Sequence, residues 1–314
     1  MKFIKDFREG ENVRSIYLCR QKTFAETKTG KTYMSLVLQD KTASIDAKVW
    51  EPNSPGIRDF EAMDYIEVIG KITSFAGSLQ MSVDQIYKAE EGSYDPSDYF
   101  PCTDKNIDEL YDTLLKYADS VKTPYLHTLL NKVFREDDTF ARSFKSHSAA
   151  KTMHHGFIGG LLEHTVSVAE LCSFYCTKYS MLNRDLLITA ALLHDMGKVY
   201  ELYEFPLNDY TDEGQLLGHI VIGSEKISEL SKDISNFPEK SLNELKHCIL
   251  AHHGELEYGS PKKPALPEAV ALNFADNTDA KLETLKELFN GVADPTQWTG
   301  YNRAFESNLR KSTI

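Results

Sequence analysis

The sequence has no uninterrupted apolar run of about 18 residues, the length that a transmembrane helix needs, so we expect no membrane span. The N-terminal stretch MKFIKDFREGENVRS has no apolar segment and no small-residue cleavage site, and we therefore expect a cytoplasmic protein. Cysteine is scarce, with 5 scattered residues in a chain of 314, which excludes a disulfide-rich secreted scaffold and indicates reduced thiols.

Basic residues are also fewer than acidic ones. The chain has 35 Lys and Arg against 47 Asp and Glu, and a net charge of −12 argues against a protein that coats nucleic acid without specificity. The deficit is uneven, because residues 1–91 carry 13 basic and 14 acidic side chains whereas the remainder carries 22 and 33. The acidic second part would need metal ions or a local basic funnel to accept a phosphodiester.

The length of 314 residues and the apolar content of 41% are those of a globular protein too long for one ordinary core, so we expect two domains. Residues 13–88 have the pattern of short strands, as in YMSLVLQD, where Met34, Leu36 and Leu38 share one face. Five such strands, with a looped or helical insert after the third, predict a five-stranded oligonucleotide/oligosaccharide-binding (OB-fold) barrel.

The rest of the chain has a different pattern. Residues 91–104 are rich in Gly, Ser, Pro and acids, and we expect them to link a barrel domain at 1–90 to an all-α domain at 105–314. Apolar residues at helical spacing predict helices that begin near Ile107 and at Pro124 and that cover residues 161–179, 184–195, 218–230, 242–252 and 268–288.

One stretch of the second domain, LLITAALLHDMGK, carries unusual chemistry. An apolar helix ends there in two adjacent candidate metal ligands, His194 and Asp195, and Gly197 is expected to let the chain turn after them. Imidazole and carboxylate ligands without thiolate suit Mn²⁺, Fe²⁺, Zn²⁺ or Co²⁺. Two such ions can clamp a phosphodiester if a carboxylate bridges them, and Asp195 is the natural bridge. The other candidate ligands are His164, His219, His252, His253 and Asp276.

Each of these residues has an ordinary alternative when it is taken alone. His164 could be a core or surface histidine, and Asp276 a helix-surface acid, although its apolar neighbours would make a buried unpaired carboxylate costly. His252 and His253 could mark a helix end, where the helix dipole favours histidine. Their order along the chain makes a joint coincidence improbable.

Taken together, these motifs resemble those of a known protein family. The pattern H…HD…D resembles the HD-domain superfamily of metal-dependent phosphohydrolases, and HHGFIGGLLEHT, LLHDMGK, AHHG and FADNTDAK resemble segments of the YhaM family of bacterial 3′→5′ exoribonucleases. That family joins an N-terminal nucleic-acid-binding barrel to an HD domain. The resemblance thus implies a multi-domain α and β protein, an OB-fold barrel followed by an all-α HD domain.

The resemblance also implies roles for individual residues. It assigns one ion to His164, His194, Asp195 and Asp276, and it assigns His219 and His252 to a second ion that shares Asp195. His253 could replace or assist His252. Lys198 matches a lysine that reaches the phosphate, where an ammonium would offset negative charge in the transition state, although a solvated lysine is the alternative. The attacking group would be water activated by the metal.

Two further histidines, His154 and His155, precede a glycine pair. They could line the pocket and bind a phosphate or the leaving group, and we include His155 among the catalytic candidates. Bonds to nearby backbone are the equally open alternative.

Binding of single strands needs stacking faces and cations. Tyr33, Trp50 and Phe75 offer aromatic faces on or near strands and Lys48 offers a charge, whereas core packing is the alternative for each aromatic ring. The tail after Asn290 has further aromatic residues that could complete an RNA channel or form a subunit contact, so a homo-oligomer stays open.

The leading hypothesis is a two-metal exoribonuclease that releases nucleoside monophosphates from single-stranded RNA and could also degrade single-stranded DNA. Manganese is the favoured ion, and both this choice and the 3′→5′ direction follow from the resemblance. One alternative is a phosphohydrolase of a small nucleotide or cyclic dinucleotide, for which a barrel that captures strands would be superfluous. Another is a binding module with an inactive metal site, against which the complete ligand set argues.

Overall fold

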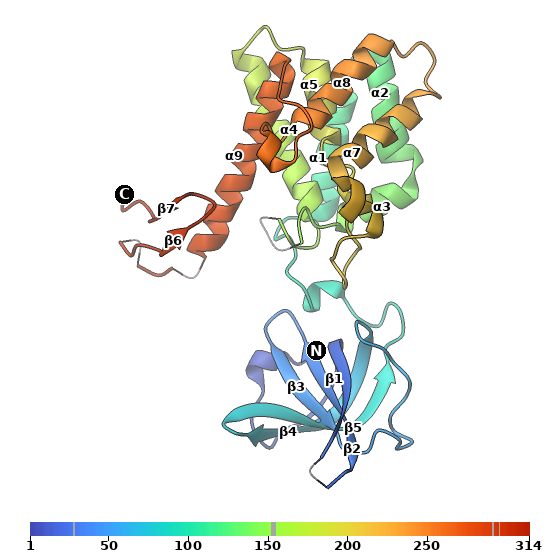
Figure 1. The fold of residues 1–314 in the computed structure, drawn as a ribbon, viewed down its shortest axis with the longest axis vertical. Coiled ribbons are helices and arrows are strands. Elements are labelled where there is room, and N and C mark those ends of the chain that lie inside the picture. Colours follow the sequence, from blue (N-terminus) through green and yellow to red (C-terminus); the bar gives the residue numbers. More distant parts are fainter. Residues whose placement is uncertain (28, 152–154, 291, 295) are drawn as a thin grey trace. The chain divides into compact units, whose positions relative to one another are not determined.

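The computed structural model of the chain describes residues 1–27, 29–151, 155–290, 292–294 and 296–314 (Figure 1). Its internal contacts divide the chain into one unit of Met1–Thr103 with Glu204–Asn208 and a second unit of Asp104–Tyr203 with Asp209–Ile314. Each unit buries its own cluster of apolar side chains.

The first unit is a closed β-barrel with the strand order β1-β2-β3-β5-β4. Neighbouring strands are antiparallel except for β3 and β5, which are parallel. This arrangement confirms the predicted OB-fold barrel. The elements of the unit are η1 (Ile4–Asp6), β1 (Asn12–Glu26), β2 (Thr32–Gln39), β3 (Ser44–Val49), β4 (Tyr65–Phe75), β5 (Ser78–Lys88) and η2 (Pro96–Asp98).

The alternation on β2 shows why these residues form a barrel. Met34, Leu36 and Leu38 are buried in its interior, whereas the residues between them are only half-buried. A strand sends successive side chains to opposite faces, so this pattern lines a closed sheet with apolar groups. The connection between β3 and β4 is a loop without a helix in the described structure, and it is held to β5 by a bridge between Ile57 and Ile86.

The second unit is a helical bundle around α5, which packs against α1, α2, α4, α8 and α9. Figure 1 shows α9 running alongside α4. The elements of this unit are α1 (Ile107–Ser120), α2 (Pro124–Asn131), η3 (Lys132–Glu136), α3 (Asp138–Ser146), α4 (Gly160–Lys178), α5 (Arg184–Leu193), α6 (Lys198–Glu201), α7 (Asp212–Ser231), α8 (Glu239–Ala251), η4 (Leu256–Tyr258), α9 (Pro267–Phe289), β6 (Tyr301–Asn302) and β7 (Ser307–Asn308).

The central position of α5 follows from its sequence. The side chain of Asn183 accepts a hydrogen bond from the backbone N–H of Leu186 and caps the first turn. Every residue from Leu186 to Leu193 is buried, because the helix is apolar on all sides and needs neighbours on all sides. A helix of this kind carries whatever follows it into the interior of the bundle.

Several features differ from the sequence expectations, and the following are the largest. Helix α3 was not predicted, although Asp137 caps it and Phe140 and Phe144 bury one face. Helix α7 begins at Asp212, before the expected start, and kinks at Gly218. A short hairpin of β6 and β7 lies in the tail, where no strand was expected. No helix in the described parts of the chain combines the length and apolarity needed to cross a membrane.

Candidate metal centre

The end of α5 delivers two polar side chains into the bundle. His194 and Asp195 follow directly after the helix, and their exposed fractions are 0% and 2%. A buried carboxylate is costly unless charged or hydrogen-bonding partners surround it. The neighbours of Asp195 therefore decide what this position can do.

The turn after Asp195 depends on Gly197, but not for the reason expected from the sequence. The chain does turn here as predicted, but Gly197 has φ −63° and ψ −21°, which any residue can adopt, so the turn does not use the conformational freedom of glycine. A Cβ atom at this position would instead lie 2.0 Å from the carbonyl oxygen of His219. Glycine is needed here because the turn presses against the backbone of α7, next to another candidate ligand.

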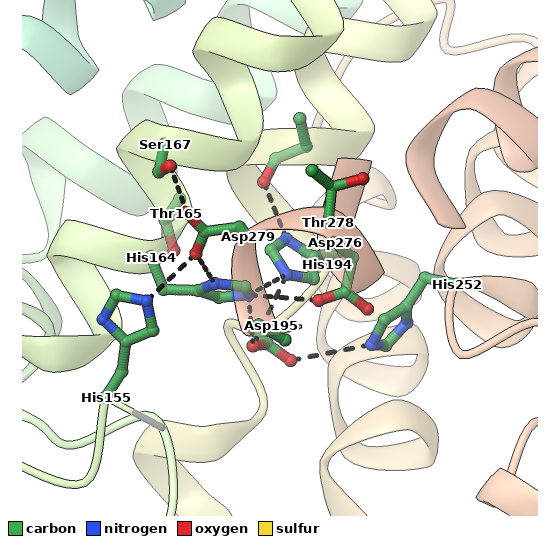
Figure 2. Close-up of polar contacts among 12 residues, drawn as sticks. His155, His164, Thr165, Ser167, His194, Asp195, His252, Asp276, Thr278 and Asp279 are labelled. Carbon is green, nitrogen blue, oxygen red and sulfur yellow. Dashed lines mark hydrogen bonds and ion pairs between the residues drawn. The ribbon is translucent and has the colours of Figure 1, made fainter. Parts of the chain in front are cut away.

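A first group of candidate ligands lies on one side of Asp195 (Figure 2). The Nε2 atom of His164 on α4 lies 3.2 Å from Nε2 of His194 and 3.5 Å from Oδ2 of Asp195. Asp276 on α9 brings its Oδ1 to 3.3 Å from the same His164 nitrogen. Three parts of the chain that are far apart in sequence thus meet at one point.

A second group lies on the other side of Asp195. Its Oδ1 atom is 3.4 Å from Nε2 of His219 and 3.6 Å from Nε2 of His252. His253 belongs to the same group, since ligand atoms of His219, His252 and His253 all lie within 4.8 Å of one another. The Asp195 carboxylate therefore presents one oxygen to each group of imidazoles.

All five imidazoles are oriented in the same way. Each Nδ1 atom lies at hydrogen-bonding distance from an oxygen, which favours the tautomer with the proton on Nδ1 and the lone pair on Nε2. The partners of Nδ1 are Asp279 for His164 (2.7 Å), the Ala191 carbonyl for His194 (2.8 Å), Glu201 for His219 (2.9 Å), the Ile249 carbonyl for His252 (2.6 Å) and the Tyr258 carbonyl for His253 (2.8 Å).

These donor atoms fit divalent ions. With Nδ1 protonated, His164 and His194 point two lone pairs at each other across 3.2 Å, an arrangement that needs positive charge nearby. On the other side, Asp195 Oδ1, His219 Nε2 and His252 Nε2 are buried and have no hydrogen-bond partner within the described residues. Nitrogen and oxygen donors without thiolate are a set that binds Mn²⁺, Fe²⁺, Co²⁺ or Zn²⁺.

The carboxylates of Asp195 and Asp276 stay ionised. Burial alone would raise the pKa of Asp195, but the charge of Lys198 and the contact with His194 outweigh it and hold that pKa well below its ordinary value. Burial also opposes ionisation of Asp276, and the contact with His164 reverses the effect and lowers its pKa. Both groups can therefore serve as anionic ligands at neutral pH.

The pKa values of His164, His252 and His253 are shifted in opposite directions when no ion is bound. Burial would lower the pKa of His164, but its contacts with Asp276 and Asp279 raise it to about 10. Burial and the neighbouring His252 lower the pKa of His253 to about 4, and burial also lowers the pKa of His252. His164 would thus hold a proton in the place of a cation, whereas His252 and His253 offer free lone pairs.

Lys198 forms an ion pair with Asp195. Its Nζ atom lies 2.8 Å from Asp195 Oδ2, and the side chain is 13% exposed. Burial would lower the pKa of Lys198, but the negative charge of Asp195 outweighs it and raises the pKa. The lysine is therefore a buried ammonium at the centre, not the solvated lysine that the sequence left open.

Asp279 is a site residue that the sequence analysis missed. It lies one turn after Asp276 on α9, and its carboxylate contacts His155 Nε2 at 3.0 Å as well as His164 Nδ1. The hydroxyl of Ser167 donates to its other oxygen. A second aspartate three residues after the first on a helix was the available signal, because such residues share a face.

Glu201 was missed for a similar reason. It lies one turn after Lys198 on the short helix α6, and its Oε1 accepts from both the backbone N–H (3.0 Å) and the Nδ1 (2.9 Å) of His219. The kink at Gly218 leaves that backbone N–H without its helical partner. Only the fold brings α6 to this point of α7.

His155 lies on the far side of His164 from the other imidazoles (Figure 2). Its ring is buried, and Nε2 faces Asp279 rather than the ligand atoms of the centre. The contact with Asp279 was not foreseen from the sequence, and a role of His155 in binding a phosphate or the leaving group stays a prediction. His154 lies outside the described residues.

The candidate nucleic-acid-binding residues of the barrel divide into two places. Tyr33 and Trp50 have ring centroids 5.2 Å apart, and the ammonium of Lys48 lies 5.7 Å from the Tyr33 centroid. Trp50 is 45% exposed, so the cluster reaches the surface. Phe75 is 73% exposed and lies at the β4–β5 hairpin, where it pairs with Ser78.

Comparisons with known proteins bear on both units. The HD domain family matches residues 161–281. The chain is 32% identical over 307 residues to a protein of Geobacillus sp. named 3′-5′ exoribonuclease YhaM, an alignment that covers 98% of this chain and 93% of that protein. A Bacillus velezensis protein of the same name is 34% identical over 291 residues, with 92% and 91% of the two chains covered.

The chain belongs to the YhaM family. The alignments to both relatives span the barrel as well as the HD domain, which confirms the resemblance noted in the sequence. Among solved structures, an OB-fold domain of replication protein A from Methanococcus maripaludis is 22% identical and covers 30% of this chain and 98% of that domain, with a TM-score of 0.24. HD-domain hydrolases bind divalent metals, and in this YhaM-family chain the His and Asp groups around Asp195 could hold them.

Proposed function

We propose that the protein is a metal-dependent 3′→5′ exoribonuclease that hydrolyses single-stranded RNA to nucleoside monophosphates, with single-stranded DNA as a further substrate. Two relatives that carry the name 3′-5′ exoribonuclease align with nearly the whole chain and support this activity. The HD domain supports hydrolysis that depends on a metal.

The observation that carries the proposal is the position of Asp195 between two groups of imidazoles. We propose that its Oδ2, His164, His194 and Asp276 hold one ion. Its Oδ1 would hold a second ion on the other side. The imidazoles assigned to that second ion are His219, His252 and His253. Mn²⁺ is the ion we propose, and Fe²⁺, Co²⁺ and Zn²⁺ suit the same donors.

The residues of the site would then act on the scissile phosphate. Bound divalent ions would neutralise its charge and lower the pKa of a water molecule toward neutrality. Asp195, which is ionised at neutral pH, would contribute one carboxylate oxygen to each half of the centre. The ammonium of Lys198, already buried beside Asp195, would bind a phosphate oxygen and offset the charge that develops during attack.

We assign capture of the strand to the barrel. The exposed ring of Trp50 beside Tyr33, with Lys48 near it, provides a stacking face and a cation. Such a face binds bases without sequence preference. Phe75 offers a second exposed aromatic ring. A phosphohydrolase of small nucleotides would have no use for such a module, so we favour a polymeric substrate.

The assay that tests the proposal follows RNA labelled at either end, with added Mn²⁺. A 3′→5′ exonuclease releases the label of a 3′-labelled strand at once as a mononucleotide, and it shortens a 5′-labelled strand step by step. Cleavage of cyclic dinucleotides or dNTPs in place of RNA would favour the small-molecule alternative. Internal cuts would contradict an exonuclease.

Asp195→Asn is the decisive variant. We expect it to lower kcat by roughly 1,000-fold or more, because several kcal/mol of transition-state stabilisation depend on the metal ions. Bound metal, measured by elemental analysis after dialysis, should fall as well. Undiminished RNA degradation by the purified variant would contradict the proposed centre.

We propose a cytoplasmic protein, which suits the free cysteines. We also propose that the exposed Trp298 and Tyr301 of the tail support a homo-oligomer, which light scattering on the purified protein would test.

A further inference from the structure

Two of the five imidazoles in the centre differ from the others in the partner of their Nδ1 atom. His194, His252 and His253 face backbone carbonyls. His164 and His219 face carboxylates. One histidine of this kind belongs to each side of Asp195.

The Asp279 carboxylate is held in place by three side chains. Its Oδ2 accepts from His164 Nδ1 (2.7 Å) and lies 3.0 Å from His155 Nε2, while Ser167 donates to Oδ1. The three partners come from two places in the chain, because His164 and Ser167 lie on α4 and His155 precedes that helix. These hydrogen bonds outweigh burial and hold the pKa of Asp279 below its ordinary value.

The backbone of His155 is itself closely packed. The carbonyl oxygen of His155 accepts a hydrogen bond from the backbone N–H of Ala149. A Cβ atom at Gly160 would lie 2.1 Å from the same oxygen, so the start of α4 can approach only as glycine. The His155 ring is therefore fixed from its backbone outward, and it fixes Asp279 in turn.

Glu201 has an equivalent place on the other side. Its carboxylate accepts two hydrogen bonds from His219, one from the backbone N–H and one from the ring Nδ1. Its own carbonyl oxygen accepts from the Thr211 backbone, and a Cβ at Gly214 would lie 2.1 Å from it. The short helix that carries Glu201 is thereby clamped against the first turn of α7.

We infer that Asp279 and Glu201 are positioning residues, each of which orients one histidine in one half of the metal centre. Asp279 holds the His164 ring so that Nε2 faces the first ion position. Glu201 does the same for His219 and the second position. A carboxylate behind a ligating imidazole fixes its tautomer and raises its basicity. The inference rests on the metal centre of the proposed function.

The first measurement is Mn²⁺ binding to the full-length protein after chelation, by calorimetry and by electron paramagnetic resonance of the free ion. Asp279→Asn and Glu201→Gln keep the shape of each side chain and remove its charge. We expect each to weaken one ion by about 10- to 100-fold and to leave the other within about threefold. Thr278→Ala, which removes an exposed hydroxyl of α9 that bonds Phe274, is the matched control and should change neither.

The second measurement assigns each effect to its histidine. His219→Ala leaves one half intact, and in that background Asp279→Asn should still weaken binding whereas Glu201→Gln should not. In a His164→Ala background the pattern should reverse. An effect of Asp279→Asn that persists at full size without His164 would overturn the inference, because it could not act through that ring.

A purely structural role would respond differently to added metal. If Asp279 and Glu201 act by orienting ligands, the loss of RNA hydrolysis in each variant should be largely rescued at high Mn²⁺. Folded variants with unchanged Mn²⁺ affinity would overturn the inference. If Asp279→Asn does not fold, Ser167→Ala removes one of the donors to Asp279, and it should weaken the same ion by a smaller factor. No change there would overturn the inference equally.

The proposed function fails by a different result. If the wild-type protein binds no divalent ion, the metal centre itself is wrong. If it binds two ions and the variants leave both affinities unchanged, only the positioning role is wrong.

Discussion

The His164 ring lies between two carboxylates of the same helix. Nε2 faces Asp276 at 3.3 Å and Nδ1 faces Asp279 at 2.7 Å. A neutral imidazole has one proton for these two anions, which is why a second proton is bound so strongly in the absence of a metal ion. A cation that enters the first ion position must compete with that proton.

The first prediction concerns pH. Because burial is outweighed by the contacts with Asp276 and Asp279, the pKa of His164 is raised to about 10, and the ring is charged at pH 7 without metal. Ion affinity should therefore rise with pH, by up to about tenfold per unit below this pKa, and level off above it. Calorimetry in buffers of different ionisation enthalpy should show about one proton released at pH 7, and no release would contradict the prediction.

The raised pKa of His164 also affects the stability of the metal-free protein, which should fall as the pH rises, whereas ion affinity should rise. A raised pKa in the folded state stabilises the metal-free protein fully below the unfolded value of 6.5, and this contribution is lost as the pH rises through about 10. Bound metal reverses the preference, because it needs the deprotonated ring. Chelated and metal-loaded protein should thus differ in the pH of greatest thermal stability.

The second prediction separates Lys198 from the ligands. Lys198→Met should lower kcat for RNA by about 100- to 1,000-fold, the usual effect of removing one charge-stabilising donor, while two ions still bind. Single-turnover rates with elemental analysis of the same samples would measure both. A normal kcat in this variant would mean that Lys198 has only a structural role, as the ion-pair partner of Asp195.

At the scale of elements, the turn between α5 and α6 packs closely against the backbone of α7. Gly197 touches the backbone of His219, and Gly223 on α7 faces the same turn with 3.5 Å of clearance for a Cβ. Both glycines lie beside the same turn, but an added Cβ would overlap backbone at Gly197 and would fit at Gly223.

The third prediction uses that pair. Gly197→Ala should destabilise the protein by about 1–3 kcal/mol or more, because two backbones must separate, and it should also weaken the ion that His219 would bind. Gly223→Ala is the control, and it should be neutral or slightly stabilising because alanine favours helix. Urea unfolding curves measure both. Equal stability of the two variants would contradict the close approach.

Much at this scale could be predicted from the sequence. The periodic apolar residues of α4, α5, α8 and α9 placed these helices to within a few residues, because long amphipathic or buried helices leave a strong pattern. The kink of α7 could not be foreseen, since a lone glycine in a helical pattern is compatible with both a straight and a broken helix. The reason for Gly197 was equally hidden, because it depends on a distant segment.

The candidate ligands could be identified from the sequence, but the carboxylates behind them could not. Metal-type residues such as His194 and Asp195 stand out because their setting is apolar. Asp279 and Glu201 do not, because an acid on a helix is most often a solvated one. Their contacts with His164 and His219 arise only when α9 and α6 are folded against their neighbours.

At the scale of the whole molecule, two separate hydrophobic cores correspond to the two functions that we propose. The strand pattern and the HD motif predicted both folds, because each depends on local periodicity and composition. How the barrel and the bundle cooperate depends on surface residues, which leave little trace in sequence.

The fourth prediction tests that division of labour. Replacing Tyr33 and Trp50 by Ala should raise KM for a long single-stranded RNA by at least about fivefold, because a stacked base contributes about 1–3 kcal/mol. Hydrolysis of bis(4-nitrophenyl) phosphate, which needs no strand capture, should be unchanged. Phe174→Ala, an exposed aromatic residue of α4, is the control. Equal loss of both activities would argue against separate roles.

The contact between Gly197 and the carbonyl of His219 has one more consequence. Because even one added carbon at Gly197 would overlap that oxygen, the main chain of α7 has little room to move toward the turn after Asp195. A second ion bound between Asp195 and His219, as we propose, would therefore have to suit a distance that the backbone sets. Ionic radius, beside donor chemistry, would then decide which metals support turnover.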